Sequence, residues 1–137
     1  MAPNEIVHKM FDNDAFSQWL GIVVEHVAEG ECTLSMTIRK DMLNGFGIAH
    51  GAITYAIADS ALAFASNSHG RQALSVDTSI NHIESLKEGD VISAVAKENA
   101  LKNKFGFYTV EIKKGETIVA LFKGTVFRSD RQWTINS

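Results

Sequence analysis

The sequence contains almost no cysteine and almost no proline. Cys32 is the only cysteine, so the chain cannot form an internal disulfide, and a lone thiol fits a reducing compartment. Pro3 is the only proline, so proline bars no later segment from the interior of a sheet. The fold therefore has to be stabilised by a hydrophobic core.

Positive charge and long apolar segments are also scarce. The 13 Lys and Arg residues are outnumbered by 16 Asp and Glu residues, and no basic run is longer than the pair Lys113-Lys114. A formal charge of −3 argues against a general nucleic-acid binder. No segment approaches the ~18 uninterrupted apolar residues of a membrane span, and residues 1–5 lack the features of a secretory signal. We expect a cytoplasmic protein that has neither nucleic acid nor a membrane as partner.

The length of the chain, 137 residues, suits one domain rather than two. Hydrophobic residues make up 45% of the sequence, which is enough to fill a core. A chain of this size buries about two-thirds of the surface that its unfolded form exposes. We therefore expect residues 1–137 to form a single domain.

Helical spacing of apolar residues occurs in two segments. Residues 4–19 show this spacing, interrupted by the turn-prone Asp12-Asn13-Asp14, and predict one or two short helices. Residues 50–68 contain six alanines and predict one long helix. Because the long helix has so little polar surface on any side, we expect it to be buried.

Alternation with a period of two residues is typical of strands and dominates the rest of the chain. The expected strands are residues 22–28, 32–39, 73–83, 91–100, 105–113 and 117–128. Within 73–83, Leu74 and Val76 are expected on the apolar face, and Ser75 and Asp77 on the polar one. The pattern predicts an α+β fold, in which an antiparallel sheet with a polar outer face wraps around the long central helix.

Asp59 is the one residue of the long helix that is ionised at neutral pH. Burying an unpaired carboxylate costs several kcal/mol, or raises its pKa until it is protonated. Asp59 therefore either reaches water, or hydrogen-bonds a Ser or Thr side chain on a neighbouring strand, or serves chemistry.

The start of the long helix is the second unusual feature. The loop Asn44-Gly45-Phe46-Gly47 precedes His50-Gly51-Ala52, where the first-turn N–H groups are unpaired and the helix dipole is positive. Gly51 has no side chain to keep a ligand away from these donors, so the turn suits an anion or a developing oxyanion. The alternative is an ordinary glycine-rich turn in which His50 caps the helix or lies in the core.

The spacing of these two features bears on the number of chains in a site. His50 and Asp59 are nine residues apart, which is about 2.5 turns and roughly 13.5 Å along the helix axis. They lie on opposite sides of the helix, so one copy of this helix cannot supply both to one active site. If both belong to one site, a second chain completes it, with Gly51 from one subunit and Asp59 from the other; a monomeric, fully active protein would contradict this.

Several motifs together resemble the hot-dog-fold thioesterases of the phenylacetate-degradation (PaaI-like) family. The similarity runs from about Met10 to Arg128 and includes the strand at residues 119–124. The motifs that carry it are Asn44-x-x-Gly47-x-x-His50-Gly51-Ala52, Ala58-Asp59-Ser60-Ala61, Ser75-Val76-Asp77 and Gly89-Asp90. The resemblance implies a hot-dog fold, acyl-CoA thioesterase activity, a homodimer with a continuous sheet as the minimal unit, and often a homotetramer.

The resemblance also implies roles for individual residues. The residue at Asp59 is the catalytic carboxylate, acting as general base on water or as nucleophile. The glycine at Gly51 gives its N–H to the thioester carbonyl, and Asn44 and His50 line the pocket of that subunit. The residue at Ser75 helps to place water beside the carboxylate of the opposite subunit.

The chain departs from the family at one position, and no motif in it identifies the residues that bind the CoA nucleotide. The family has His-Gly-Gly where this chain has Ala52, whose methyl group narrows the acyl pocket without removing the Gly51 donor. Lys102, Lys104 and Arg71 are candidates for binding the CoA phosphates, as is Lys123, although each is also typical of a solvated surface residue.

The function expected from this resemblance is hydrolysis of aryl-acetyl (phenylacetyl-type) CoA thioesters. The alternatives are the same reaction on medium or long aliphatic acyl chains, and a non-catalytic acyl-CoA-binding module. A thioester is already activated, so we expect neither a metal nor another cofactor beside the CoA of the substrate. The five histidines, at positions 8, 26, 50, 69 and 82, are too scattered to suggest a metal site.

Overall fold

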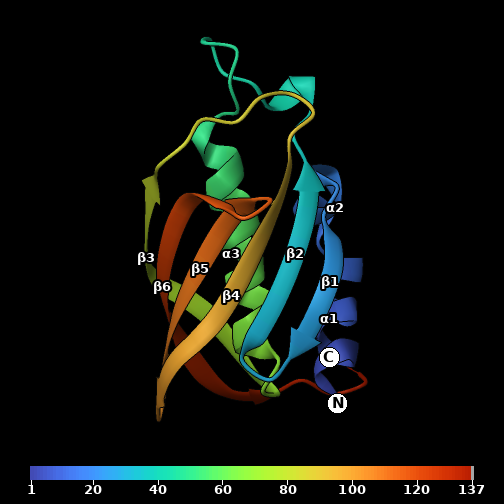
Figure 1. Cartoon of the computed structure of the whole chain (residues 1–137). Helices are drawn as coiled ribbons and strands as arrows, with labels where there is room; N and C mark the ends of the chain where they lie inside the picture. The colour runs from blue at the N-terminus through green and yellow to red at the C-terminus, as the bar shows by residue number, and fades with distance from the viewer. Residues whose placement is uncertain (137) are drawn as a thin grey trace.

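A computed structural model describes residues 1–136, in which one antiparallel sheet curves around a long helix (Figure 1). Over these residues the sheet has six strands in the order β1-β2-β4-β5-β6-β3. The strands are β1 (Val23–Ala28), β2 (Glu31–Thr37), β3 (Arg71–His82), β4 (Val91–Lys102), β5 (Phe105–Lys114) and β6 (Thr117–Gln132). The helices are α1 (Pro3–Asp12), α2 (Ala15–Leu20) and α3 (Gly51–Asn67), with a 3-10 turn at Lys40–Met42. The predicted α+β class and the wrapping of the sheet around the central helix are confirmed.

The helix α3 forms the centre of the hydrophobic core, as its alanines predict. Twelve of its 17 residues are buried. The sheet approaches the helix closely, because a Cβ atom at Gly124 on β6 would lie 2.6 Å from Cδ2 of Leu62. A larger residue at Gly124 would displace Leu62, so glycine at this position sets the distance between sheet and helix.

The strand β3 differs from its predicted alternation. Leu74 and Val76, expected on the buried face, are 77% and 59% exposed. The pairing of β3 with β6 shifts register between Ser75 and Asp77, which adds one residue to β3 and exchanges its faces. Ser75 is paired with the buried Val126 and therefore lies on the side of the sheet that faces α3. The β-bulge thus turns a residue expected outside toward the helix.

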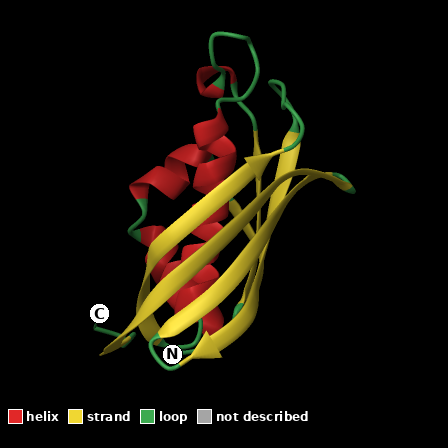
Figure 2. Cartoon of the chain, turned by 90° about the vertical axis from the view of Figure 1, so that its left-hand side faces the viewer, coloured by secondary structure: helices red, strands yellow, loops and turns green. Residues whose placement is uncertain are grey.

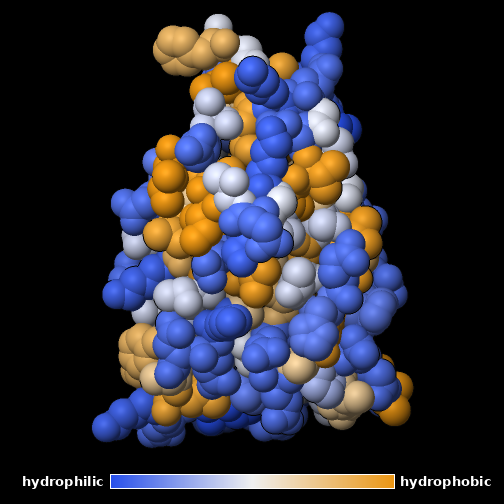
Figure 3. Space-filling model, viewed as in Figure 1, coloured by the Kyte–Doolittle hydropathy of each residue, from blue (hydrophilic) through white to orange (hydrophobic). Residues whose placement is uncertain are grey.

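The outer face of the sheet is less polar than predicted. Large apolar side chains are exposed there among charged ones, and the space-filling view shows patches of both kinds (Figure 3). The exposed large apolar residues that β4, β5 and β6 present on this face, which we call the outer patch, are Val91, Phe105, Phe107, Leu121 and Phe127. The outer face is therefore mixed rather than uniformly polar, because alternation shows which residues share a face but not that every residue on that face is polar.

The N-terminal helices and the C-terminal tail close one end of the core. The helices lie together on one side of the sheet (Figure 2), and α1 buries Ile6 and Val7. The tail after β6 is tied to α1 because Lys9 Nζ donates to the carbonyls of Thr134 and Ile135, at 3.0 and 2.8 Å. It is tied to α3 because Trp133 Nε1 donates to Asn67 Oδ1 at 2.8 Å. Within the described residues, no helix is long and apolar enough to span a membrane.

Candidate functional site

Asp59 lies halfway along α3 and lines a small cavity of about 140 Å³ between the helix and the strand β3. Ser75 and Leu74 of β3 and Ala63 of α3 line the same cavity. Within residues 1–136 the Asp59 carboxylate makes no hydrogen bond or ion pair, although the residue is partly buried. The alternative in which a Ser or Thr side chain satisfies this carboxylate is therefore not the one observed.

Burial raises the pKa of Asp59 above its usual value, and the nearby negative charge of Asp14 raises it further. Asp14 is the N-cap of α2, where its Oδ1 accepts from the Ser17 N–H at 2.9 Å. A carboxylate with a raised pKa is a stronger base, which suits proton transfer near neutral pH.

We predict that Asp14→Asn lowers the pKa of Asp59, because it removes the second cause of the shift while asparagine still caps α2. The pKa is measured from the carboxyl carbon of Asp59 by an NMR titration. Asp12→Asn is the matched control, since it removes the same charge from an exposed side chain at the end of α1 and is expected to leave the titration unchanged. Equal titration curves for wild type and Asp14→Asn would contradict the assigned cause.

The start of α3 lines a second cavity, of about 260 Å³. Asn44 of the glycine loop, Gly51, Thr54 and His82 of β3 all contribute to its wall. The Gly51 N–H has no acceptor in residues 1–136 because it belongs to the first turn of the helix. A Cβ atom at Gly51 would lie 3.2 Å from His82 Nε2, so glycine keeps the space beside the amide open.

His50 and Asn44 have defined structural roles beside this cavity. The His50 Nδ1 accepts from the Ala52 N–H at 3.0 Å, so this exposed histidine caps α3 and does not line the cavity. The Ala52 amide is thereby occupied, which leaves the Gly51 amide as the free donor of the turn. Asn44 Oδ1 accepts from the Phe46 and Ile48 N–H groups, at 2.9 and 3.4 Å, and holds the loop in shape.

The structure separates the expected site residues into two groups. Asn44 and Gly51 share one cavity, Asp59 and Ser75 share the other, and no residue lines both. Ser75 lines the same cavity as the Asp59 of its own chain, whereas the resemblance implied a place beside the carboxylate of the opposite subunit. The bulge at Val76 explains this placement, since it turns Ser75 toward α3.

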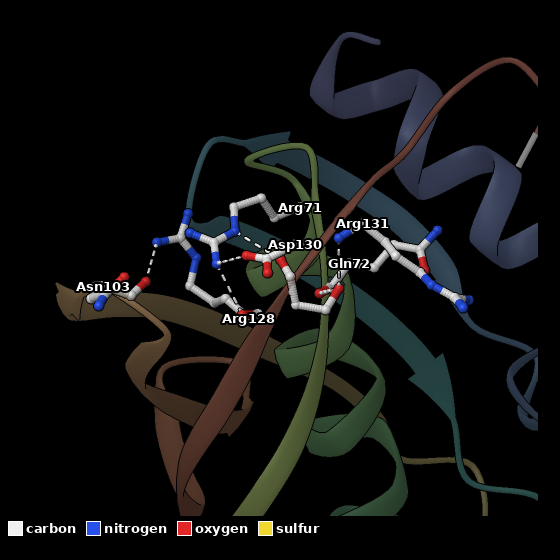
Figure 4. Close-up of polar contacts among 7 residues, drawn as sticks. Arg71, Gln72, Asn103, Arg128, Asp130 and Arg131 are labelled. Atoms are coloured by element: carbon white, nitrogen blue, oxygen red, sulfur yellow. Dashed lines mark hydrogen bonds and ion pairs between the residues drawn. The ribbon is translucent and has the colours of Figure 1, made fainter.

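The three expected phosphate-binding cations lie away from both cavities. Lys102 ends β4 and Lys104 lies in the turn before β5, and both are exposed. Arg71 is engaged instead with the end of β6, where its Nε donates to the Ser129 carbonyl at 2.9 Å and its Nη2 to the Arg128 carbonyl at 3.0 Å (Figure 4). Arg128 in turn donates from its own N–H to the Lys104 carbonyl at 2.6 Å. Arg71, Arg128 and the turn carrying Lys104 therefore form one basic corner of the sheet.

His82 is a residue of the Gly51 cavity that sequence reasoning did not assign to the site. Its Nδ1 lies 3.2 Å from Thr54 Oγ1, and its ring faces Gly51. No local pattern marks this histidine, because it reaches the cavity only through the pairing of β3 with β6 and the packing of β3 on α3. The predicted strand 73–83 contained it, but its face was not assigned.

Known proteins resemble the chain over most of its length. The family model described as "Thioesterase superfamily" matches residues 46–121. The acyl-coenzyme A thioesterase PaaI of Escherichia coli is 34% identical over 122 residues, which are 88% of this chain and 87% of that protein. The solved structure of the E. coli PaaI protein from the phenylacetic acid degradation operon matches with a TM-score of 0.93 at 32% identity, over 96% of each chain. A mutant of the phenylacetic acid degradation protein PaaI from Thermus thermophilus is 40% identical, with a TM-score of 0.83 over 85% of this chain and 100% of that one.

Proposed function

Because the chain belongs to the thioesterase superfamily and is a thioester hydrolase, we propose that it hydrolyses acyl-CoA thioesters, with aryl-acetyl groups preferred. The observation that carries the proposal is the Asp59 carboxylate, which is unpaired, has a raised pKa and lines a cavity. The likeness to PaaI of E. coli, a protein named as an acyl-CoA thioesterase, supports CoA as the thiol part of the substrate.

In the proposed reaction Asp59 acts as general base. It takes a proton from a water molecule held beside it by the Ser75 hydroxyl, and the water oxygen attacks the thioester carbonyl carbon. The carbonyl oxygen becomes an oxyanion that accepts a hydrogen bond from the Gly51 N–H. One such donor commonly raises the rate of the reaction about 10²–10³-fold. When the tetrahedral intermediate collapses, the carbon–sulfur bond breaks and the proton passes from Asp59 to the CoA sulfur. A thioester needs no further activation, so the proposal includes no metal or cofactor.

The proposal requires two copies of the chain. β3 is an edge strand, because it pairs with β6 on one side only, and Leu74 and Val76 are exposed along it. Its first half carries Ser75 of the Asp59 cavity, and its end carries His82 of the Gly51 cavity. Antiparallel pairing of two β3 strands would therefore place the Gly51 cavity of one chain beside the Asp59 cavity of the other. This homodimer has a two-fold axis and a continuous sheet.

Three further parts of the proposal concern assembly, the nucleotide and location. A homotetramer, as a dimer of dimers, needs a second interface, and the apolar outer patch supplies a surface for it.

Arg71, Lys102 and Lys104 remain candidates for binding the CoA phosphates, and their position at or near the basic corner supports this. A cytoplasmic location is supported by Cys32, which is an unpaired and buried thiol.

The test of the function is a CoA-release assay with a thiol reagent, over a panel of phenylacetyl-, hydroxyphenylacetyl-, acetyl-, octanoyl- and palmitoyl-CoA. We expect the highest kcat/KM with the two aryl-acetyl thioesters, and the same rates with EDTA present. A higher kcat/KM with octanoyl- or palmitoyl-CoA would replace the aryl-acetyl proposal by the aliphatic one. Binding of all five without release of CoA would overturn hydrolysis and favour a binding module.

A further inference from the structure

A third cavity, of about 540 Å³, adjoins the Asp59 cavity and has no role in the reaction described above. The two cavities share three lining residues, Ala63, Ala73 and Leu74. The larger one continues to Met10 of α1 and to Trp133 of the C-terminal tail, and we call it the tail compartment. Its volume lies in the range of small-molecule sites, whereas the Asp59 cavity is smaller than that range.

The helix α3 leads from the catalytic carboxylate into the tail compartment. Asp59, Ala63 and Asn67 are spaced by four residues, so they lie on one face of the helix at intervals of about 6 Å. Ala63 is at the boundary of the two cavities, and Asn67 lines the tail compartment beyond it. The side chains of Ala63 and Ala73 at this boundary are small.

The polar groups of Asn67 already have hydrogen-bond partners within the protein, so a ligand at this part of the wall needs no polar group. Its Nδ2 donates to the carbonyls of Ala63 and Ala73, at 2.8 and 3.0 Å. Its Oδ1 accepts from the Ala73 N–H at 2.9 Å and from Trp133 Nε1 at 2.8 Å. These four bonds use the two donors and two acceptor positions of the amide.

Aromatic and thioether side chains supply much of the remaining wall. Met10 and Trp133 lie at the end formed by α1 and the tail. Aromatic faces and edges pack well against another ring, and methionine sulfur also makes favourable contacts with rings. Arg131 is the only charged residue of the lining, and its side chain is exposed and points away from Arg71 and Arg128 (Figure 4).

We infer that the tail compartment receives the aromatic ring of the acyl group, which passes from the Asp59 cavity between Ala63 and Ala73. This inference rests on the proposed function. A ring joined to the thioester carbonyl by one methylene extends about one helical turn, roughly 5.4 Å, from the carbonyl carbon, which brings it level with Ala63. Substituents on the far side of the ring then point toward Met10 of α1 and Trp133 of the C-terminal tail, which form the far wall of the compartment.

The inference is tested by Ala63→Phe, whose side chain would fill the boundary between the cavities. We expect the ratio of kcat/KM for phenylacetyl-CoA to that for acetyl-CoA to fall about 10-fold or more, since an acetyl group ends before Ala63. Ala2→Phe is the matched control, because it adds the same ring at an exposed position ahead of α1. Equal losses for both substrates in a folded Ala63→Phe variant, or no loss for either, would overturn the inference.

A second variant acts at the far wall and keeps the inference testable should Ala63→Phe fail to fold. Met10→Ala enlarges the compartment, so we expect the ratio of kcat/KM for naphthylacetyl-CoA to that for phenylacetyl-CoA to rise several-fold. An unchanged ratio would contradict the inference. If the wild-type protein hydrolyses phenylacetyl-CoA but neither variant changes selectivity, the compartment assignment fails while the proposed function stands; if it hydrolyses no thioester, the proposed function itself fails.

Discussion

Replacing Asp59 by asparagine is expected to reduce the release of CoA about 10³-fold or more, because the amide has almost the same shape but cannot take a proton from water. Asp59→Ala is expected to lose activity to a similar extent. KM should change little in Asp59→Asn, since the lost group acts on the water and not on the CoA nucleotide. The measurement is kcat and KM for phenylacetyl-CoA by thiol release. If both variants hydrolyse at the native rate, Asp59 is not the catalytic group.

The same substitution separates loss of chemistry from loss of fold. The pKa of Asp59 is raised in the folded protein, so the folded state holds this proton more tightly than the unfolded state does. Stability is therefore lost as the pH rises from the ordinary aspartate pKa through the raised one. Asparagine does not ionise, so we expect Asp59→Asn to have a higher Tm than wild type at neutral pH, and the difference to shrink below the ordinary aspartate pKa. A lower Tm at neutral pH would mean that the carboxylate stabilises the fold.

The sequence predicted the central helix and the reactive carboxylate because both signals are local. Six alanines in one segment leave no polar face, and a single ionised residue among them stands out. Helix geometry also places His50 and Asp59 on opposite sides of α3, and Gly51, next to His50, lines a different cavity from Asp59. These features need no knowledge of which strands pair.

Features that depend on which strands pair, or on how the C-terminal tail packs against the helices, could not be predicted from such local signals. The bulge at Val76 is visible only in the register of β3 against β6, and it reverses the faces of Leu74 and Ser75. His82 reaches the Gly51 cavity through the same pairing. Trp133 lines the tail compartment because the chain after β6 folds back onto α1 and α3, which no periodic pattern indicates.

Mixing two inactive variants is expected to restore activity if each site is built from two chains. Asp59→Ala removes the base from the Asp59 cavity. Gly51→Val fills the Gly51 cavity, where even a Cβ atom at position 51 would lie 3.2 Å from His82 Nε2. A mixed dimer then holds one site with neither change and one site with both. With random pairing, half of the dimers are mixed and half of their sites are intact, so about a quarter of the native activity should return.

The control for this experiment is each variant unfolded, refolded and assayed alone, which should remain inactive. Differently tagged chains show by sequential affinity purification that mixed dimers have formed. If each chain holds a complete site, every site in the mixture carries one change and no activity returns. Recovery near a quarter would therefore mean that one chain brings the Gly51 amide and the other brings Asp59 with Ser75, joined across the β3 edge. Absence of recovery in demonstrated mixed dimers would require the Gly51 and Asp59 cavities to act within one chain, although no residue lines both.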